Sequence, residues 1–495
     1  PRLPRLAPRT LPARLVIGGS PDATKKGGFA RVGGIVASSL RPMRLPQEDS
    51  NSPDETPPQN SDSPSHIQQI LRSLRKKRCG PWLTGIILSG RMLTDRPKVC
   101  FVSLMCLLDR RSGAAKTVSG TLEMLARQGF ESYSSTASLC DGDTEYPMKE
   151  AFGPKIDLEK ARGNRIRISQ NKVHHNVYLT ESSLGQKLTR EEARGYVKMA
   201  IQDLERIRPD IVITYGGSEI SRILREKAKQ LGAHIIFYLA NESYMDIKDF
   251  SLVDTVLCPS EYTANLYRER LGLDPAVFRS IIPANVIPKN PISRLGPEAR
   301  EHGLITMVNP SGAKGGTLFF RLVEMAAQQR PDLTFLALES RSSKETWTKA
   351  GLEIGILPNL WWLVNQRQMH RVYARTTILL VPSFWQESSA RVAAEAQLAG
   401  IPVLASRRGG IPDQLNGAGF LFDLPERCTK NFGAIPTREE VQPWLDTILR
   451  LVDDDAFYRE SSDKALEAAQ PFHPEQRAKD VAQRFRSFLE MPLLQ

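Results

Sequence analysis

The sequence predicts an α/β protein with two parallel, doubly wound sheets behind a disordered tail. Strand patterns alternate with helix patterns from residue 98 onward, and this alternation pauses over a Pro/Gly/charge-rich stretch, residues 289–303, before it restarts. Residues 1–66 hold too few apolar side chains to offset the entropy of ordering. We therefore predict a tail and linker over 1–97, a first α/β domain over 98–290, a second over 304–475, and a C-terminal helix over 476–495.

The net charge of +12 is concentrated in the tail. Residues 1–98 carry a net charge of +10, so residues 99–495 carry only +2. Nucleic-acid binders usually have a strongly basic folded surface. The charge distribution therefore argues against DNA or RNA as a partner.

Two further features bear on the compartment. The six cysteines are scattered and show no spacing typical of metal ligands, which favours a reducing cytoplasm and no metal site. No apolar run is long enough to span a membrane. Residues 67–90 join a basic amphipathic stretch to an apolar one; we expect a plain linker, with peripheral contact to an anionic membrane as the alternative.

In the first domain, strand patterns alternate with helix patterns, which is typical of a parallel sheet. The strand candidates are VCFVSLMCLL, IRIS, VHHNVYLT, IVITYGG, HIIFYLAN and VDTVLCPS. After the first strand comes DRRSGAAKTVSG, a loop of small residues around Gly113 that leads into a helix. Gly113 would let a ligand approach the backbone, but the loop taken alone favours an ordinary turn.

In the second domain, the stretch 379–406 reads as strand, loop, helix and strand. Glu387 falls in the loop at the carboxyl end of the first strand, and Glu395 lies about two turns into the helix region. Ser388 and Ser389 are candidates for the helix cap. Ligands of open parallel sheets bind at this edge, so the two carboxylates are candidate ligand-binding groups; the alternative is that both are solvated surface charges.

Two Gly-rich loops also follow strands of the second domain. VNPSGAKGG, residues 308–316, places Lys314 beside Gly315, a combination suited to a diphosphate because the backbone can approach it and the ammonium supplies charge. The alternative is a plain loop lysine. RRGGIPD, residues 407–413, contains Gly409 and Gly410, which permit a tight turn near a ligand.

The spacing Glu387, seven residues, Glu395, with VPS before it and EA and G-x-P-V after it, resembles the E-x7-E signature of family four (group 1) retaining glycosyltransferases. The resemblance covers roughly residues 98–490. It implies the GT-B fold, in which two Rossmann-like domains face a cleft and the last helix crosses back to the first domain. It also implies a metal-independent enzyme of polysaccharide biosynthesis type, without cofactor, that uses a nucleotide-diphosphate sugar and a glycan or lipid-linked acceptor.

The resemblance assigns a role to each candidate. Lys314 would clamp the diphosphate, Glu387 the transferred sugar and Glu395 the ribose hydroxyls. The other expected donor-binding residues are Ser388, Ser389, Ala390, Gly315, Gly409, Gly410, Gly113 and Asn241.

Three departures from the family pattern stand out. Asn241 stands near the strand end where the family often has a histidine, Ser388-Ser389-Ala390 replaces a Gly/Phe pattern, and Asp413 replaces a glutamate. The departures leave a non-catalytic sugar-nucleotide or glycan-binding protein as the alternative function. A sugar-nucleotide epimerase on the same fold has no support in these motifs.

Overall fold

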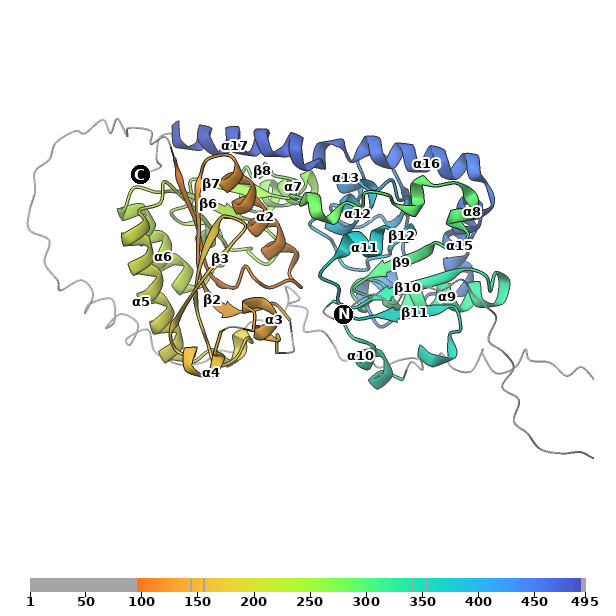
Figure 1. The fold of residues 1–495 in the computed structure, drawn as a ribbon, viewed down its shortest axis with the longest axis horizontal. Coiled ribbons are helices and arrows are strands. Elements are labelled where there is room, and N and C mark those ends of the chain that lie inside the picture. The colour runs from red at the N-terminus through yellow and green to blue at the C-terminus, as the bar shows by residue number, and fades with distance from the viewer. Residues whose placement is uncertain (1–95, 143–144, 155, 341, 352–353, 491–495) are drawn as a thin grey trace, which may run out of the picture. The chain divides into compact units, whose positions relative to one another are not determined.

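The computed structural model describes residues 96–142, 145–154, 156–340, 342–351 and 354–490, all of which belong to one compact unit of the chain. The expectations for residues 1–95, including the tail and the membrane alternative at 67–90, lie outside the described residues. Two sheets flanked by helices form the described part (Figure 1). The predicted α/β class with two mainly parallel sheets is confirmed.

The first sheet has eight strands in the order β3-β4-β2-β1-β5-β6-β7-β8. Its strands are β1 (Lys98–Met105), β2 (Glu131–Leu139), β3 (Arg165–Gln170), β4 (Val173–Tyr178), β5 (Ile211–Thr214), β6 (His234–Tyr238), β7 (Thr255–Cys258) and β8 (Ala276–Val277). Its helices are α2 (Gly113–Arg127), α3 (Met148–Phe152), α4 (Leu158–Ala161), α5 (Arg190–Ile207), α6 (Glu219–Gln230) and α7 (Glu261–Leu271).

Strand β3 departs from the predicted all-parallel arrangement, because it pairs with β4 in the antiparallel sense. Only Asn171 and Lys172 connect the two strands, and both have left-handed φ angles, 49° and 66°. A two-residue connection can join only antiparallel strands, and left-handed residues suit such a hairpin turn. The hairpin therefore adds an antiparallel edge to an otherwise parallel sheet.

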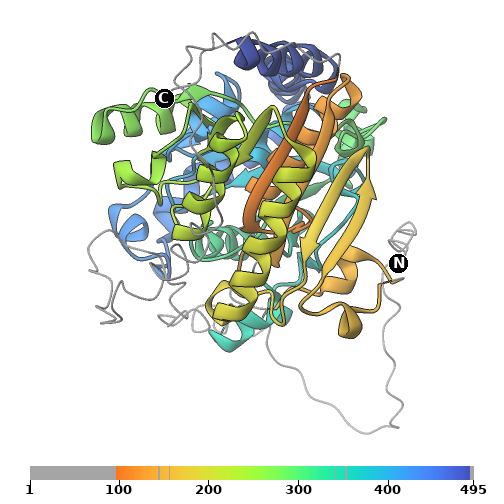
Figure 2. The ribbon, with the colours of Figure 1, turned by 90° about the vertical axis from the view of Figure 1, so that its left-hand side faces the viewer.

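Alternating strand residues bury the two faces of this sheet separately. In β1, Val99 and Phe101 pack with α2 and α7, whereas Cys100 and Val102 pack with α5 and α6. Figure 2 shows α5 and α6 over the second of these faces. Helices on both faces are the doubly wound arrangement that the strand and helix alternation predicts.

The second sheet has six parallel strands in the order β11-β10-β9-β12-β13-β14. They are β9 (Leu304–Val308), β10 (Thr334–Leu338), β11 (Leu360–Leu363), β12 (Thr376–Val381), β13 (Val403–Ser406) and β14 (Phe420–Phe422). The helices after residue 290 are α8 (Pro297–Arg300), α9 (Gly316–Gln329), α10 (Lys344–Lys349), α11 (Met369–Tyr373), α12 (Arg391–Gln397), α13 (Ile411–Leu415), α14 (Glu426–Lys430), α15 (Arg438–Asp453), α16 (Asp455–Ala468) and α17 (Pro474–Glu490).

Helix α17 follows the second sheet in the chain but packs into the core of the first. Val481, Ala482, Phe485 and Phe488 are buried in the cluster that contains Val99. The guanidinium of Arg484 also donates a hydrogen bond to the carbonyl of Val277 in β8 (2.8 Å). The last described helix thus completes the apolar core of the first sheet.

Candidate active site

The loop between β9 and α9 is shaped by glycine at two consecutive positions. Gly315 has φ +81°, and a Cβ there would lie 2.0 Å from the carbonyl oxygen of Pro382. At Gly316 a Cβ would lie 2.4 Å from the ring of Trp347, which is buried. The loop therefore fits closely against the end of β12, and Lys314 is held at that point.

Lys314 is paired with Glu387. The Lys314 ammonium lies 2.5 Å from Oε1 of Glu387, and the hydroxyl of Ser383 donates to the same oxygen at 2.6 Å. The side chain of Glu387 is 11% exposed and that of Lys314 34% exposed. The structure thus brings together the predicted phosphate clamp and the predicted sugar ligand, which are 73 residues apart in the sequence.

The two glycines after β13 lie directly against Glu387. The N–H of Gly410 donates to the carbonyl of Glu387, and a Cβ on Gly409, whose φ is +52°, would lie 2.3 Å from the same oxygen. Arg408, just before them, donates from Nε to the carbonyl of Phe384 (3.2 Å). Burial lowers the pKa of Arg408, while Tyr262 and Glu242 oppose this effect. The sequence pattern had not singled out this cation.

The helix after Glu387 begins later than the cap candidates suggested. Helix α12 starts at Arg391, its N-cap is Ala390, and no side chain caps it. Ser389 instead donates to the side-chain oxygen of Gln414 (2.6 Å). The prediction that Ser388 or Ser389 caps the helix is wrong, because the chain continues in an irregular loop past both serines.

Glu395 is buried and has a partner on each carboxylate oxygen. Nε of Arg391 donates to Oε1 at 2.8 Å, and the hydroxyl of Tyr373 donates to Oε2 at 2.7 Å. Burial, and next the charge of Glu395, raise the pKa of Tyr373 well above its usual value. Arg391 could have been anticipated from its position four residues before Glu395, but Tyr373 carries no such signal.

The first turn of α2 lies close to this carboxylate. Nη1 of Arg391 is 3.4 Å from the hydroxyl of Thr117. The neighbouring Lys116 is exposed at its surface, but the surrounding protein atoms partly desolvate its ammonium and so lower its pKa. The nearby negative charge of Glu395 opposes this effect. A Cβ added to Gly113 would meet nothing within 4 Å. The loop around Gly113 is therefore open, and Lys116 is a charged neighbour that the sequence pattern did not single out.

The structure shows which groups two of the departures from the family pattern contact. Asn241 is exposed, and its side-chain oxygen accepts a hydrogen bond from the N–H of Ser243 (3.1 Å). Asp413 accepts a hydrogen bond from the N–H of Tyr262 in the first turn of α7 (2.8 Å). Asp413 thus stabilises a helix start, where a carboxylate is favourable.

The histidines of the first domain hold structural positions. His175 is buried in β4, where its Nδ1 lies 2.8 Å from the hydroxyl of Ser134, and burial lowers its pKa to about 4. The ring of His234 stacks on Phe488 of α17, and burial also lowers its pKa. In the described ranges, no group of three or more His, Cys, Asp or Glu side chains is arranged to hold a metal ion. None of the described helices is long and apolar enough to cross a membrane.

Comparisons with known proteins bear on the family and on the fold. Residues 306–452 match the family model described as Glycosyl transferases group 1. A D-inositol 3-phosphate glycosyltransferase of Nocardioides sp. is 33% identical over 129 residues, which is 25% of each chain. A lipopolysaccharide 1,2-N-acetylglucosaminetransferase of Salmonella typhimurium is 24% identical over 297 residues, 56% of this chain and 72% of that protein.

Among solved structures, sucrose-phosphate synthase of Thermosynechococcus elongatus has a TM-score of 0.56 at 16% identity, covering 80% of this chain and all of that one, 100%. Anabaena HepE in complex with UDP and glucose gives 0.54 at 16% identity, with 80% and 100% covered. The fold is that of the GT-B glycosyltransferases. Residues 306–452, the segment that matches the group 1 glycosyltransferase model, hold Lys314, Glu387 and Glu395.

Proposed function

We propose that the protein is a retaining, metal-independent glycosyltransferase that moves a sugar from a nucleotide-diphosphate sugar to a hydroxyl of a glycan or lipid-linked acceptor. The pairing of Lys314 with Glu387 is the observation that carries the proposal. It sets a cation and a carboxylate side by side at the carboxyl end of a parallel sheet, where ligands of such sheets bind. The Salmonella protein is named as an N-acetylglucosaminetransferase, and the Anabaena structure is a complex with UDP and glucose. Both are consistent with a nucleotide-diphosphate sugar as the donor.

The charges favour a diphosphate beside Lys314. Helix α9 begins immediately after it with Gly315 as N-cap and no side-chain cap, so backbone N–H groups at its start can complement an anion. When the sugar leaves, negative charge grows on the departing phosphate. The ammonium of Lys314 would stabilise that charge in the transition state.

The two glutamates would bind different parts of the donor. Glu395 already accepts hydrogen bonds from Arg391 and Tyr373, but a carboxylate has about four acceptor positions, so two remain for ribose hydroxyls. Glu387 would contact hydroxyls of the transferred sugar. In the retaining mechanism that the family resemblance implies, the acceptor attacks from the face that the nucleotide leaves, and the departing phosphate takes the acceptor's proton. No cofactor other than the donor would be needed.

The test is incubation of the protein with a panel of labelled nucleotide sugars, followed by measurement of released nucleoside diphosphate. Release that continues in EDTA, together with a product of unchanged anomeric configuration, would support the proposal. An inverted product or loss of release in EDTA would refute retention or metal independence respectively.

A non-catalytic sugar-nucleotide or glycan-binding protein is the second candidate. The observation that favours it is the strand end near Asn241, where no histidine stands and the amide oxygen is engaged by Ser243. An amide cannot act as an acid or base. This candidate predicts that nucleotide sugars raise the melting temperature without release of nucleoside diphosphate from any member of the panel.

A further inference from the structure

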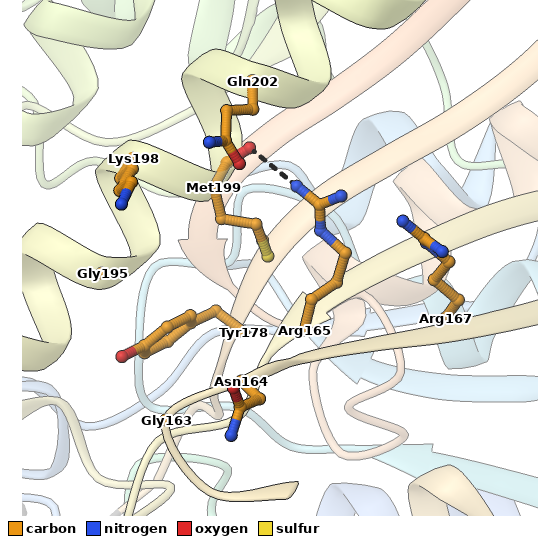
Figure 3. Close-up of a pocket in the computed structure, with 9 residues that line it drawn as sticks. All are labelled: Gly163, Asn164, Arg165, Arg167, Tyr178, Gly195, Lys198, Met199 and Gln202. Carbon is orange, nitrogen blue, oxygen red and sulfur yellow. Dashed lines mark hydrogen bonds between the residues drawn. The ribbon is translucent and has the colours of Figure 1, made fainter.

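A hollow of about 740 Å³ lies at the β3 edge of the first sheet, between that strand and α5. It shares no residue with the candidate active site. A second hollow of about 290 Å³ adjoins it, because both are lined by Arg167. Together they form what we call the edge groove. Figure 3 shows the larger hollow, with Arg165 reaching from β3 to the backbone of α5.

The edge groove is lined by positive charge. Arg165, Arg167, Lys198 and Arg206 line it, and none of its described lining residues is an aspartate or glutamate. In the described part of the chain, Arg167 and Lys198 have no carboxylate within ion-pair distance. Since residues 99–495 have a net charge of only +2, this is a local concentration of charge.

One buried carboxylate lies behind two of these arginines. Asp203 is 3.2 Å from Arg165 and 3.4 Å from Arg206. It offsets one of the four positive charges, and the Nε of Arg165 remains buried without a hydrogen-bond partner. The edge groove therefore keeps an excess of positive charge, which favours an anionic ligand.

The spacing of the cations suits an extended ligand. Lys198 and Arg206 are eight residues apart on α5, which corresponds to about 12 Å along the helix axis. Asn164, Gln202 and Ser169 add amide and hydroxyl groups between and beside the charges. Such groups can exchange hydrogen bonds with sugar hydroxyls.

The aromatic rings and apolar side chains of the edge groove argue against two other anionic partners, a single-stranded nucleic acid and a membrane. The ring of Tyr178 is packed against α5, where a Cβ on Gly195 would lie 2.3 Å from its hydroxyl, and Tyr133 packs on His174 with centroids 5.5 Å apart. Neither ring is free to stack on the bases of a single strand. Of the exposed large hydrophobic residues in the described ranges, none lies on β3 or α5, so nothing there would insert into a membrane.

We propose that the edge groove binds an anionic glycan, a chain of sugars that carries two or more phosphate, sulfate or carboxylate groups. The edge groove is separate from the candidate donor site around Lys314. It would hold such a chain through Arg167 and Lys198 at the surface and Arg165 beneath them.

The test compares the full protein with an Arg167→Gln/Lys198→Gln double variant. Both side chains are exposed, so the fold should survive the change. Lys349→Gln/Lys479→Gln is the matched control, because it removes two exposed lysines from α10 and α17 and changes the net charge equally. The probe is a fluorescent heparin-derived hexasaccharide, with neutral maltohexaose, a single-stranded oligonucleotide and phosphatidylglycerol vesicles measured alongside.

We expect the edge-groove variant to bind the sulfated hexasaccharide at least about tenfold more weakly than the control variant. The reason is that the variant loses two charge-assisted contacts, each of which adds to the affinity. Neutral maltohexaose should not bind in the groove. Equal binding by the two variants would overturn the proposal and leave the arginines the role of protecting an exposed strand edge. A selective loss of oligonucleotide or vesicle binding with unchanged hexasaccharide binding would also overturn it. UDP binding, measured in parallel, should be the same in both variants and separates this test from that of the proposed transferase.

Discussion

Replacing Glu387 by glutamine probes the centre of the proposed donor site. In the structure its Oε1 lies 2.5 Å from the Lys314 ammonium. A phosphate oxygen bound to that ammonium would come within about 5 Å of the carboxylate. Two like charges at such a separation repel by about 1 kcal/mol in a water-like medium and by several kcal/mol in a less polar one. Because Lys314 is 34% exposed, we take the lower end of this range.

The expected result is that Glu387→Gln tightens UDP binding by about fivefold, which corresponds to about 1 kcal/mol. Glutamine is nearly isosteric and its oxygen can still accept the hydrogen bond from Ser383. Turnover should fall, because the substitution removes the charged contact to the transferred sugar. UDP carries no such sugar, so only its binding becomes tighter. Isothermal titration with UDP and a nucleoside-diphosphate release assay measure the two effects.

Two variants serve as controls. Lys314→Met should weaken UDP binding but leave uridine binding unchanged, and Glu345→Gln, an exposed change in α10, should alter neither. If Glu387→Gln weakens UDP binding as strongly as Lys314→Met does, the carboxylate orients the lysine for the diphosphate and the reasoning from repulsion is refuted. If neither substitution alters UDP binding, the diphosphate does not bind at Lys314.

Three further predictions concern stability and the nucleotide. Gly315→Ala should cost at least about 2 kcal/mol of unfolding free energy, because of its left-handed φ and a backbone clash, whereas Gly113→Ala should change it by less than about 0.5 kcal/mol; thermal denaturation compares the two. Burial lowers the pKa of His175 to about 4, so His175 binds fewer protons in the folded state than in the unfolded state. Stability should therefore fall by up to about 3 kcal/mol as the pH drops from about 6.5 to 4. His175→Gln should flatten that loss, as measured by denaturant titrations at each pH. Glu395→Gln should lower stability by about 1 to 3 kcal/mol and weaken UDP binding, whereas Tyr373→Phe should lower stability by a similar amount with a smaller effect on UDP.

Each of these has a contradicting outcome. Equal stability of the two glycine variants would mean that the loop after β9 relaxes freely around a Cβ. A wild-type stability that is flat between pH 6.5 and 4 would show that His175 gains a proton without cost. Unchanged UDP binding in Glu395→Gln would place the ribose elsewhere.

The fold was accessible from the sequence because its signals are local. The stretch 379–406 shows this: its strands appear as β12 and β13, and the helix between them as α12. Errors arose where a local signal was overridden. Two serines looked like helix caps, but the helix starts only at Arg391, and an Asn171-Lys172 turn reverses a strand that the alternation alone predicted to be parallel.

The site was accessible only as separate pieces. Lys314 and Glu387 each stand out in their own motif, yet their direct contact depends on two loops from different strands and on Gly315, which lets them approach. One of the two partners of Glu395, Tyr373, lies in a helix 22 residues earlier and belongs to no motif. Such contacts depend on tertiary packing, which spacing in the sequence does not encode.

The position of α17 has a consequence for biosynthesis. Phe485 and Phe488 fill the core of a sheet whose last strand ends at Val277, so about two hundred residues, including the whole second sheet, are translated before that core can close. Throughout this interval α2 and α7 would cover this face of the first sheet, but the part of the core that α17 fills would stay exposed. Synthesis of this protein should therefore depend on protection of the nascent chain until α17 emerges from the ribosome. A premature stop codon before residue 474 would leave the first sheet without the part of its cover that α17 provides, although every strand of both sheets had been made.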